Sequence, residues 1–322
     1  MKIERQKSFG REVHDGRAVD IVFGVDAPFI PIMGICITSI LKNNPAQIFS
    51  FHIFLDEIDA LNEKKFAKLC TQYPTTQITL YFLPPDLYKN FYVEGNYSKA
   101  IFYRITAADF LSARLDKLIY MDADMLCLKP LNELLRLSIE RYFLAAVVDK
   151  GEWIPLRKKE LGLSANYRYF NSGFLYLNLE YWRRENFSAQ ILQVLSNGEY
   201  SFPDQDAMNI LADKKNYPIR HISDRYNHFF RVDGKEQPLR DDVVIEHFAG
   251  QLKPWQQWCE SPLKEIYKSY QKNSLWRDFV YQPRNYQEHR LMGRACRRAG
   301  NWLEAFKWYW SYLKRRRVEK KS

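Results

Sequence analysis

The sequence predicts an α/β fold with a largely parallel central sheet, followed by a C-terminal helical extension. Apolar strand-like runs alternate with segments of helical spacing over much of the 322-residue chain, and this alternation is typical of parallel sheets. Several of these runs end in an acidic residue. From about Tyr267 the composition shifts to tryptophan, tyrosine, arginine and lysine, which marks the extension.

The first elements form strand and helix units. Asp20–Asp26 is a short apolar run that predicts a strand, followed by a loop and a helix over Phe29–Leu41. Ile48–Leu55 and Gln77–Leu83 have strand composition, and Leu61–Leu69 between them has helical spacing. These segments predict strands joined by crossover helices.

The next elements place polar residues at the ends of strands. Ile101–Leu115 predicts a helix that leads into a strand over Lys117–Asp122, and Tyr142–Asp149, Phe174–Leu179 and Val243–Glu246 predict further strands. In open α/β sheets, ligands bind at the carboxyl ends of the strands. We therefore expect one site there. Its expected members are Asp26, Asp122, Asp124, Asp149 and His247.

Two helices are expected near the C-terminus, over Tyr286–Ala299 and Trp302–Arg317, joined at Gly300 and Asn301. They predict an appended helical hairpin. The expected domain limits are an N-terminal extension over 1–18, the main α/β domain over 19–266 and a basic, aromatic helical extension over 267–322.

Composition and charge narrow the class of protein. Hydrophobic residues make up 46% and charged residues 27%, which is typical of packed globular proteins. The formal net charge of +10, concentrated toward the C-terminus, favours an anionic partner. The five cysteines are odd in number and lack zinc-ligand spacing, which favours a reducing compartment. No secretory signal is evident and the apolar run Phe29–Leu41 is too short to span a bilayer, so we expect peripheral membrane contact.

The Asp122-Ala-Asp124 segment directly follows an apolar strand. It offers two carboxylates from one turn, and sites rich in oxygen favour Mg²⁺ or Mn²⁺. An acidic loop that merely caps the following segment has the same pattern. This segment alone therefore does not decide between the two interpretations.

The second motif is His247-Phe-Ala-Gly250-Gln-Leu-Lys253-Pro-Trp255. A glycine lets the backbone approach a phosphate, a lysine supplies a positive charge for it, and a histidine can complete a metal site. Taken singly, His247 would be a packing residue and Lys253 a surface charge. Their spacing favours a metal and phosphate site instead.

With these two motifs in this order, the chain resembles family 8 glycosyltransferases. Phe170-Asn-Ser-Gly-Phe174 is similar to the family's F-N-[AS]-G segment, and Asp204-Gln205-Asp206 is similar to its D-Q-D segment. The resemblance runs from about Asp20 to Trp258, and the tail resembles the C-terminal extension of the lipopolysaccharide α-hexosyltransferase branch.

The resemblance implies a GT-A fold, a nucleotide-sugar donor, and Mn²⁺ or Mg²⁺ that bridges the diphosphate. It implies that Asp122, Asp124 and His247 are metal ligands, with Asp122 also reaching the ribose. The implied diphosphate contacts are Gly250 and Lys253, and Asp26 corresponds to a uracil-binding aspartate. The residues implied around the donor hexose are Arg104, Asp149, Asn171, Asp204 and Gln205.

Four observations keep alternatives open. Pro28 stands where relatives often have a polar residue that contacts the nucleotide. Asp26 could instead cap the following helix, and Asn171 could order a turn. Arg104 could instead be a structural ion-pair partner.

The resemblance implies a retaining α-hexosyltransferase that moves galactose or glucose from UDP to the lipopolysaccharide outer core. Another bacterial glycan as acceptor, or a non-catalytic UDP-sugar-binding membrane scaffold, is the alternative. Retention could proceed through a covalent glycosyl-enzyme or by front-face attack. We favour front-face attack, because the amide of Gln205 is a poor nucleophile.

The last predicted helix has a broad apolar and aromatic face opposite Lys307, Ser311, Lys314 and Arg315. This pattern is typical of helices that lie in a membrane interface, and equally of a helix packed on the main domain. We expect the protein on the inner face of the bacterial inner membrane. The chain lacks a recognised nucleic-acid motif, so we expect no nucleic-acid partner, and no oligomeric state is predicted.

Overall fold

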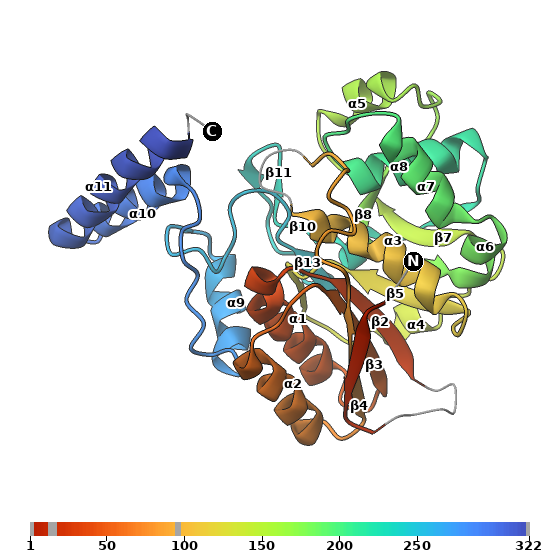
Figure 1. Ribbon diagram of the computed structural model, residues 1–322, viewed down its shortest axis with the longest axis horizontal. Helices are drawn as coiled ribbons and strands as arrows, with labels where there is room; N and C mark the ends of the chain where they lie inside the picture. The colour runs from red at the N-terminus through yellow and green to blue at the C-terminus, as the bar shows by residue number, and fades with distance from the viewer. Residues whose placement is uncertain (1–2, 12–17, 94–97, 320–322) are drawn as a thin grey trace. The chain divides into compact units, whose positions relative to one another are not determined.

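The computed structural model describes residues 3–11, 18–93 and 98–319. The chain divides into two compact units, Met1–His247 and Phe248–Ser322 (Figure 1). Residues 1–2 and 12–17 of the expected N-terminal extension, and Lys320 and Lys321 of the basic tail, lie outside the described residues. The expected domain limit between residues 266 and 267 falls inside the second unit and stays a prediction.

The first unit is built on one large sheet, which in the described residues has eight strands in the order β1-β4-β3-β2-β5-β8-β7-β9. Parallel pairing joins β2 to both β3 and β5, β3 to β4, and β7 to β9. Antiparallel pairing joins β1 to β4, and β8 to both β5 and β7. The strands are β1 (Arg5–Phe9), β2 (Val19–Gly24), β3 (Phe49–Leu55), β4 (Thr76–Phe82), β5 (Lys117–Met121), β7 (Leu144–Val148), β8 (Phe170–Asn178) and β9 (Ile219–His221).

The direction of β8 matters for the site. This strand begins at Phe170, earlier than the sequence predicts, and runs antiparallel to β5, with Phe174 opposite Met121. Because the two strands run in opposite directions, the start of β8 lies at the edge where β5 ends. Asn171 therefore shares that edge with the Asp122 to Asp124 turn.

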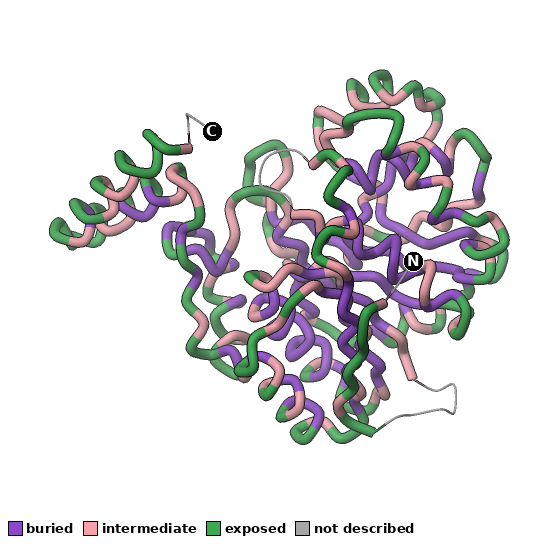
Figure 2. Tube along the Cα trace, viewed as in Figure 1, coloured by how far each residue is buried: buried purple, intermediate pink, exposed green. Residues whose placement is uncertain are grey.

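Helices cover both faces of the large sheet (Figure 1). On one face, alternate strand residues such as Val22, Phe54 and Tyr81 form a core with Phe102 and Ala108 of the segment that includes α3. Figure 2 shows that the strands and the inner sides of the helices are largely buried. The helices of this unit are α1 (Ile30–Asn43), α2 (Ala60–Gln72), α3 (Tyr103–Leu111), α4 (Asn132–Leu135), α5 (Ile154–Glu160), α6 (Leu179–Arg184), α7 (Phe187–Ser196) and α8 (Pro203–Lys214), with short 3-10 helices η1 (Ala27–Phe29), η2 (Lys99–Phe102) and η3 (Asp224–Tyr226).

A smaller sheet carries the histidine of the second motif. It consists of β10 (His228–Phe229), β13 (Ile245–His247) and β6 (Met125–Cys127), with β13 between the other two. The strand predicted over Val243–Glu246 thus starts two residues later and includes His247. Since β13 pairs with β6 and His247 lies opposite Met125, this sheet places the histidine beside the turn between β5 and β6. A two-stranded sheet follows β10, from β11 (Arg231–Val232) and β12 (Lys235–Glu236).

The second unit contains α9 (Leu263–Lys272), α10 (Tyr286–Arg298) and α11 (Trp302–Glu319). The predicted helical hairpin is present as α10 and α11. Gly300 between them has a φ of 75°, a left-handed conformation that glycine adopts without steric cost at the end of a helix. In the described ranges, no helix has both the length and the apolar character that crossing a membrane requires.

Candidate active site

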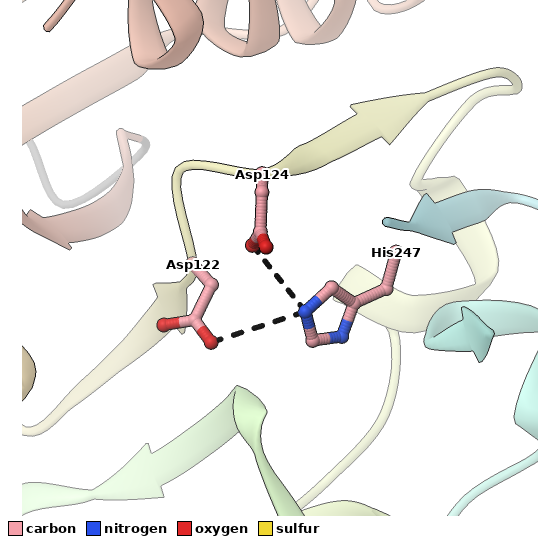
Figure 3. Close-up of side chains that lie close together, drawn as sticks. All are labelled: Asp122, Asp124 and His247. Carbon is pink, nitrogen blue, oxygen red and sulfur yellow. Dashed lines mark ion pairs between the residues drawn. The ribbon is translucent and has the colours of Figure 1, made fainter. Parts of the chain in front are cut away.

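Asp122, Asp124 and His247 converge at the edge of the large sheet, and each offers one ligand atom within 4.8 Å of the others (Figure 3). The Nε2 atom of His247 lies 3.3 Å from Oδ1 of Asp124 and 4.0 Å from Oδ2 of Asp122. The aspartates stand in the turn after β5, and the histidine ends β13. Two sheets therefore assemble a three-residue cluster from distant parts of the chain.

Gly173 makes room for this cluster. A Cβ atom at this position would lie 2.5 Å from Cε1 of His247 and 2.8 Å from Oδ2 of Asp122. Both distances are shorter than real carbon contacts allow, so any larger residue would displace a cluster side chain. The F-N-S-G segment thus supplies space at the cluster as well as polar groups.

The cluster fits a hard divalent cation. At Mg²⁺–ligand distances of about 2.0–2.1 Å, donors on opposite sides of an ion lie roughly 4.2 Å apart. Nε2 of His247 lies within that range of both carboxylate oxygens, at 3.3 Å and 4.0 Å, and all three ligand atoms lie within 4.8 Å of one another. Nδ1 of His247 is 2.8 Å from Oδ1 of Asn227, so Nε2 is the nitrogen that faces the carboxylates. Two carboxylates and an imidazole are a ligand set that suits Mn²⁺ or Mg²⁺.

Arg104 orients Asp122. Its Nη2 donates to Oδ1 of Asp122 at 2.8 Å, its Nε lies 3.1 Å from Oδ2 of Asp204, and its Nη1 donates to the carbonyl of Ser172. The hydroxyl of Tyr120 also donates to Oδ1 of Asp122, at 3.0 Å. With Oδ1 held in this way, Oδ2 of Asp122 is left to face His247. The ion-pair role considered for Arg104 is therefore present, directly beside the cluster.

Asp149, Asn171 and Gln205 form one hydrogen-bonded group. Nε2 of Gln205 donates to Oδ2 of Asp149 at 2.8 Å, and Nδ2 of Asn171 donates to the same oxygen at 3.1 Å. Burial raises the pKa of Asp149, against the lowering effect of these donors. Oδ1 of Asn171 also accepts from the backbone N–H of Gly173, two residues on, at 2.9 Å, so the turn role considered for Asn171 is present together with its contact to Asp149.

The amide oxygen of Gln205 is already engaged. It accepts from the backbone N–H of Ser172 at 2.9 Å and from Nδ2 of Asn171 at 3.0 Å. A nucleophile needs a lone pair that is available to the sugar carbon. These bonds therefore make Gln205 a poor nucleophile, in line with the preference for front-face attack.

Asp204 lies behind the group. Its Oδ2 accepts from Oγ of Ser172 at 3.0 Å and pairs with Arg104. Burial raises the pKa of Asp204, and the nearby Arg104 charge opposes that rise. Asp204 thus joins the D-Q-D segment to the ion pair that orients Asp122.

Asp26 follows β2 at the start of η1. It holds the N-cap position, but its side chain makes no capping hydrogen bond. Burial raises the pKa of Tyr103, and the carboxylates of Asp56 and Asp26 add to that rise. The carboxylate of Asp26 thus lies near enough to Tyr103 to act on its hydroxyl, and no capping hydrogen bond supports the capping role considered for Asp26.

Gly250 and Lys253 belong to the second unit, and their roles toward the cluster stay predictions. Gly250 has a φ of 93°, so a side chain there would strain the backbone even though it would meet no neighbour. Nζ of Lys253 donates to the carbonyl of Phe248. Gln256 closes the loop, accepting from the N–H of Lys253 at 2.9 Å and donating to the carbonyl of Gln251 at 3.1 Å.

Comparison with known proteins decides the family. The sequence profile of glycosyl transferase family 8 matches residues 20–259, which is most of the chain. This chain belongs to glycosyltransferase family 8. As a family 8 protein with the Asp122, Asp124 and His247 cluster, it is a glycosyltransferase.

Curated relatives within family 8 match over nearly the full chain. A lipopolysaccharide 1,3-galactosyltransferase of Salmonella typhimurium is 29% identical, over 95% of this chain and 93% of that protein. Lipopolysaccharide glucosyltransferase WaaO of Escherichia coli is 30% identical, over 92% of this chain and 90% of that protein.

Solved structures share the fold. The galactosyltransferase LgtC, in complex with donor and acceptor sugar analogues, has a TM-score of 0.65 and 21% identity, and the match covers 80% of this chain and 96% of that one. The bifunctional glycosyltransferase WbbM has a TM-score of 0.68 and 19% identity, over 84% of this chain and 52% of that one. The expected GT-A fold of this family 8 chain is confirmed.

Sequence reasoning missed three contributors to this family 8 site. Gly173 and Ser172 lie in the F-N-S-G segment, so their roles at the cluster were within reach of the motif. Asn227 follows η3 and belongs to no recognised motif, and its contact with His247 appears only in the fold.

Proposed function

We propose that this family 8 glycosyltransferase is a retaining α-hexosyltransferase that moves galactose or glucose from UDP to the lipopolysaccharide outer core. The Asp122, Asp124 and His247 cluster carries the proposal, because it is a carboxylate and imidazole site fit for the metal of a UDP-sugar. The curated relatives named above support this choice of donor sugars and acceptor.

In the proposed reaction, the bond between the anomeric carbon and the UDP oxygen breaks while the acceptor hydroxyl bonds to the same carbon from the same face. Mn²⁺ or Mg²⁺ at the cluster supplies Lewis-acid stabilisation of the diphosphate. Lys253 provides positive charge to the departing β-phosphate, and Gly250 lets the loop backbone approach it. The departing phosphate oxygen accepts the proton of the acceptor hydroxyl, so no protein base is required.

The remaining site residues bind and orient the donor in this proposal. Asp26 accepts from the uracil ring, and Asp122 reaches the ribose as well as the metal. The wall against the donor hexose is formed by Arg104, Asp149, Asn171, Asp204 and Gln205. The side chains of Asn171, Asp204 and Gln205 are hydrogen-bonded to neighbouring residues, which supports a fixed binding surface.

We also propose that α11 attaches the protein to the anionic inner face of the bacterial inner membrane. One side of the helix packs within its own unit: Ala305 is 2% exposed, and Trp308 and Tyr312 contact the rings of His289 and Tyr286. The opposite side leaves large apolar residues exposed to solvent. These are Trp302, Leu303, Phe306, Trp310 and Leu313.

The exposed apolar residues form one stripe. At 100° per residue these five residues span about 100° of the helix circumference, and the exposed Val318 lies about 60° beyond them. Lys307 and Lys314, expected opposite the broad apolar face, lie beside this narrower exposed stripe, Arg317 lies within it, and all three are exposed. Aromatic side chains flanked by cations are typical of helices that lie in an anionic membrane interface. One face of α11 thus packs within its own unit, and the exposed face supports the lipid interpretation, while packing on the main domain stays a prediction.

Two other functions compete with the proposal. A related transferase with another bacterial glycan as acceptor would keep the same donor site. A non-catalytic UDP-sugar-binding membrane scaffold would also bind the donor, but it would not release UDP. Metal-dependent release of UDP therefore separates the scaffold from both enzymes.

The deciding experiment presents the purified protein with UDP-galactose or UDP-glucose, Mn²⁺, and a panel of truncated lipopolysaccharide core oligosaccharides. We expect one hexose to be transferred with retention, and NMR of the product gives its anomeric configuration and linkage. Chelation of the metal should stop the reaction. Transfer with inversion, or UDP release without transfer to any core oligosaccharide, would contradict the proposal.

A further inference from the structure

Asn227 connects the proposed metal site to the large sheet. It is 1% exposed, its Oδ1 lies 2.8 Å from Nδ1 of His247, and its Nδ2 donates to Oδ1 of Asn171 at 2.9 Å. Oδ1 of Asn171 also accepts from the backbone N–H of Gly173 at 2.9 Å. An unbroken series of hydrogen bonds therefore runs from a backbone amide to the imidazole.

The direction of each bond in this series is fixed. A backbone N–H can only donate, so the atom of Asn171 that faces Gly173 must be its oxygen. The nitrogen of the same amide faces an acceptor, since Nδ2 of Asn171 donates to Oδ2 of Asp149 at 3.1 Å. Asn227 must then present its NH₂ group to Asn171 and its oxygen to His247.

This order decides which imidazole nitrogen carries the proton. Since Oδ1 of Asn227 can only accept, Nδ1 of His247 must donate to it. The tautomer of a histidine is set by the bond that its other nitrogen makes. A neutral His247 therefore keeps its lone pair on Nε2, the atom that faces Asp122 and Asp124.

The backbone of Gly173 also holds Asp122, the other proposed ligand beside His247. The carbonyl of Gly173 accepts from the backbone N–H of Asp122 at 2.8 Å. Gly173 thus positions Asp122 through its oxygen and His247 through its N–H, by way of Asn171 and Asn227. One residue of β8 therefore positions both proposed ligands, through its two flanking peptide groups.

We propose that Asn227 is a positioning residue that holds His247 in the Nδ1–H tautomer, ready to bind a divalent cation through Nε2. This inference rests on the proposed metal site. Without the Asn227 acceptor, His247 would adopt the Nε2–H tautomer to avoid a buried N–H that lacks a partner. Its Nε2–H would then donate to Asp124, and both groups would be lost as ligands.

The test compares Asn227→Leu, Asn227→Asp and wild type in two measurements without any donor sugar. Affinity for Mn²⁺ is obtained from the electron paramagnetic resonance signal of free Mn²⁺. The tautomer of His247 in the metal-free protein is obtained from ¹⁵N NMR of histidine-labelled protein, assigned with a His247→Gln variant. Neither measurement depends on catalysis.

We expect Asn227→Leu to raise the Kd for Mn²⁺ by about 10- to 100-fold, as loss of an outer partner of a metal ligand does. Its His247 should show the Nε2–H tautomer. Asn227→Asp keeps an acceptor, so it should keep the Nδ1–H tautomer and bind Mn²⁺ more tightly than Asn227→Leu. If Asn227→Leu does not fold, the tautomer of Asn227→Asp decides alone.

Asn178→Leu is the matched control. Asn178 is also a buried asparagine with several hydrogen bonds, but it ends β8 at the edge away from the cluster. Its replacement should leave the Kd for Mn²⁺ unchanged. An unchanged Kd in Asn227→Leu, or an Nε2–H tautomer in wild type or in Asn227→Asp, would overturn the inference.

Asp124→Asn shows whether a negative result concerns the role of Asn227 or the proposed metal site itself. If Asp124→Asn binds Mn²⁺ as wild type does, the metal site itself is wrongly placed. If Asp124→Asn loses Mn²⁺ while Asn227→Leu retains it, the metal site stands and only the role of Asn227 fails.

Discussion

The sheet unit and the last helix use their large aromatic residues in opposite ways. In the sheet unit, Phe143 is fully buried, and its ring lies 4.5 Å from that of Phe187 and 5.8 Å from that of Trp182. On α11, Phe306 and Trp310 are 70% and 55% exposed. Buried rings stabilise the fold, whereas exposed rings leave apolar surface available for binding. The buried rings thus stabilise the unit that holds the site, whereas the exposed rings of α11 are the ones that we propose bind the membrane.

The largest expected effect concerns the site alone. Asp124→Asn should lower hexose transfer on the order of 10³-fold or more, because metal stabilisation of the leaving group amounts to several kcal/mol. Binding to anionic vesicles should not change. The measurement is the initial rate with Mn²⁺, alongside vesicle sedimentation and circular dichroism. Full activity of a folded Asp124→Asn protein would contradict the assignment of Asp124 as a metal ligand.

The next effect tests the two kinds of aromatic residue directly. Phe143→Ala should lower the free energy of unfolding by about 3–5 kcal/mol, because it leaves a cavity among packed rings. Phe306→Ala should change it by no more than about 0.5 kcal/mol, as an exposed substitution does. Urea unfolding followed by tryptophan fluorescence measures both. Equal losses in the two variants would mean that Phe306 is not a solvent-exposed residue in solution.

Lys253→Ala tests the positive charge that we propose for the departing diphosphate. Turnover should fall about 10²-fold, since the lysine is needed most as the diphosphate leaves. The Michaelis constant for the UDP-hexose should change less, because interactions made mainly in the transition state affect turnover. Steady-state kinetics separates the two quantities. Unchanged turnover with only a raised Michaelis constant would show that Lys253 merely holds the bound donor.

The smallest expected effect concerns membrane binding by α11. Replacing Phe306 and Trp310 together by serine should weaken sedimentation with anionic vesicles by about 10- to 100-fold, given roughly 1.5–3 kcal/mol for each fully buried ring and partial insertion. Transfer to a soluble core oligosaccharide should persist, and transfer to a membrane-embedded acceptor should fall.

A control for that variant removes two exposed leucines of the first unit, Leu61 and Leu156, which are 63% and 62% exposed. Their replacement by serine removes apolar surface without touching α11, so vesicle binding should persist. If the control loses binding as fully as the α11 variant does, the membrane assignment of α11 is wrong.

The main elements of the fold were predictable because apolar periodicity records burial. Strands such as β2 and β3, and helices such as α10 and α11, lie close to where the pattern places them. The strand β1 carries no such pattern, since four of its five residues are exposed, and it was not predicted. The direction of β8 was also not predictable, because an apolar strand has the same composition in either orientation.

The residues of the site also divide into those that the sequence predicts and those that only the fold brings into contact. Short motifs identified Asp122, Asp124 and His247, and the fold brings them together. Contacts between distant segments carry no local signal. The pairing of Arg104 with Asp122 and Asp204, and the bond from Asn227 to His247, appear only once the sheet is formed. Sequence therefore predicts the proposed metal ligands better than the groups that orient them.

The pairing of β13 with β6 has a consequence for biosynthesis. Asp124 precedes β6 and His247 ends β13, so more than a hundred residues must be made between the first ligands and the last. At about 5–20 residues per second, that interval lasts on the order of ten seconds. During it, the nascent chain carries two of the three ligands and lacks the strand that delivers the third. Metal binding to the full proposed ligand set therefore has to wait until β13 has been made and paired with β6.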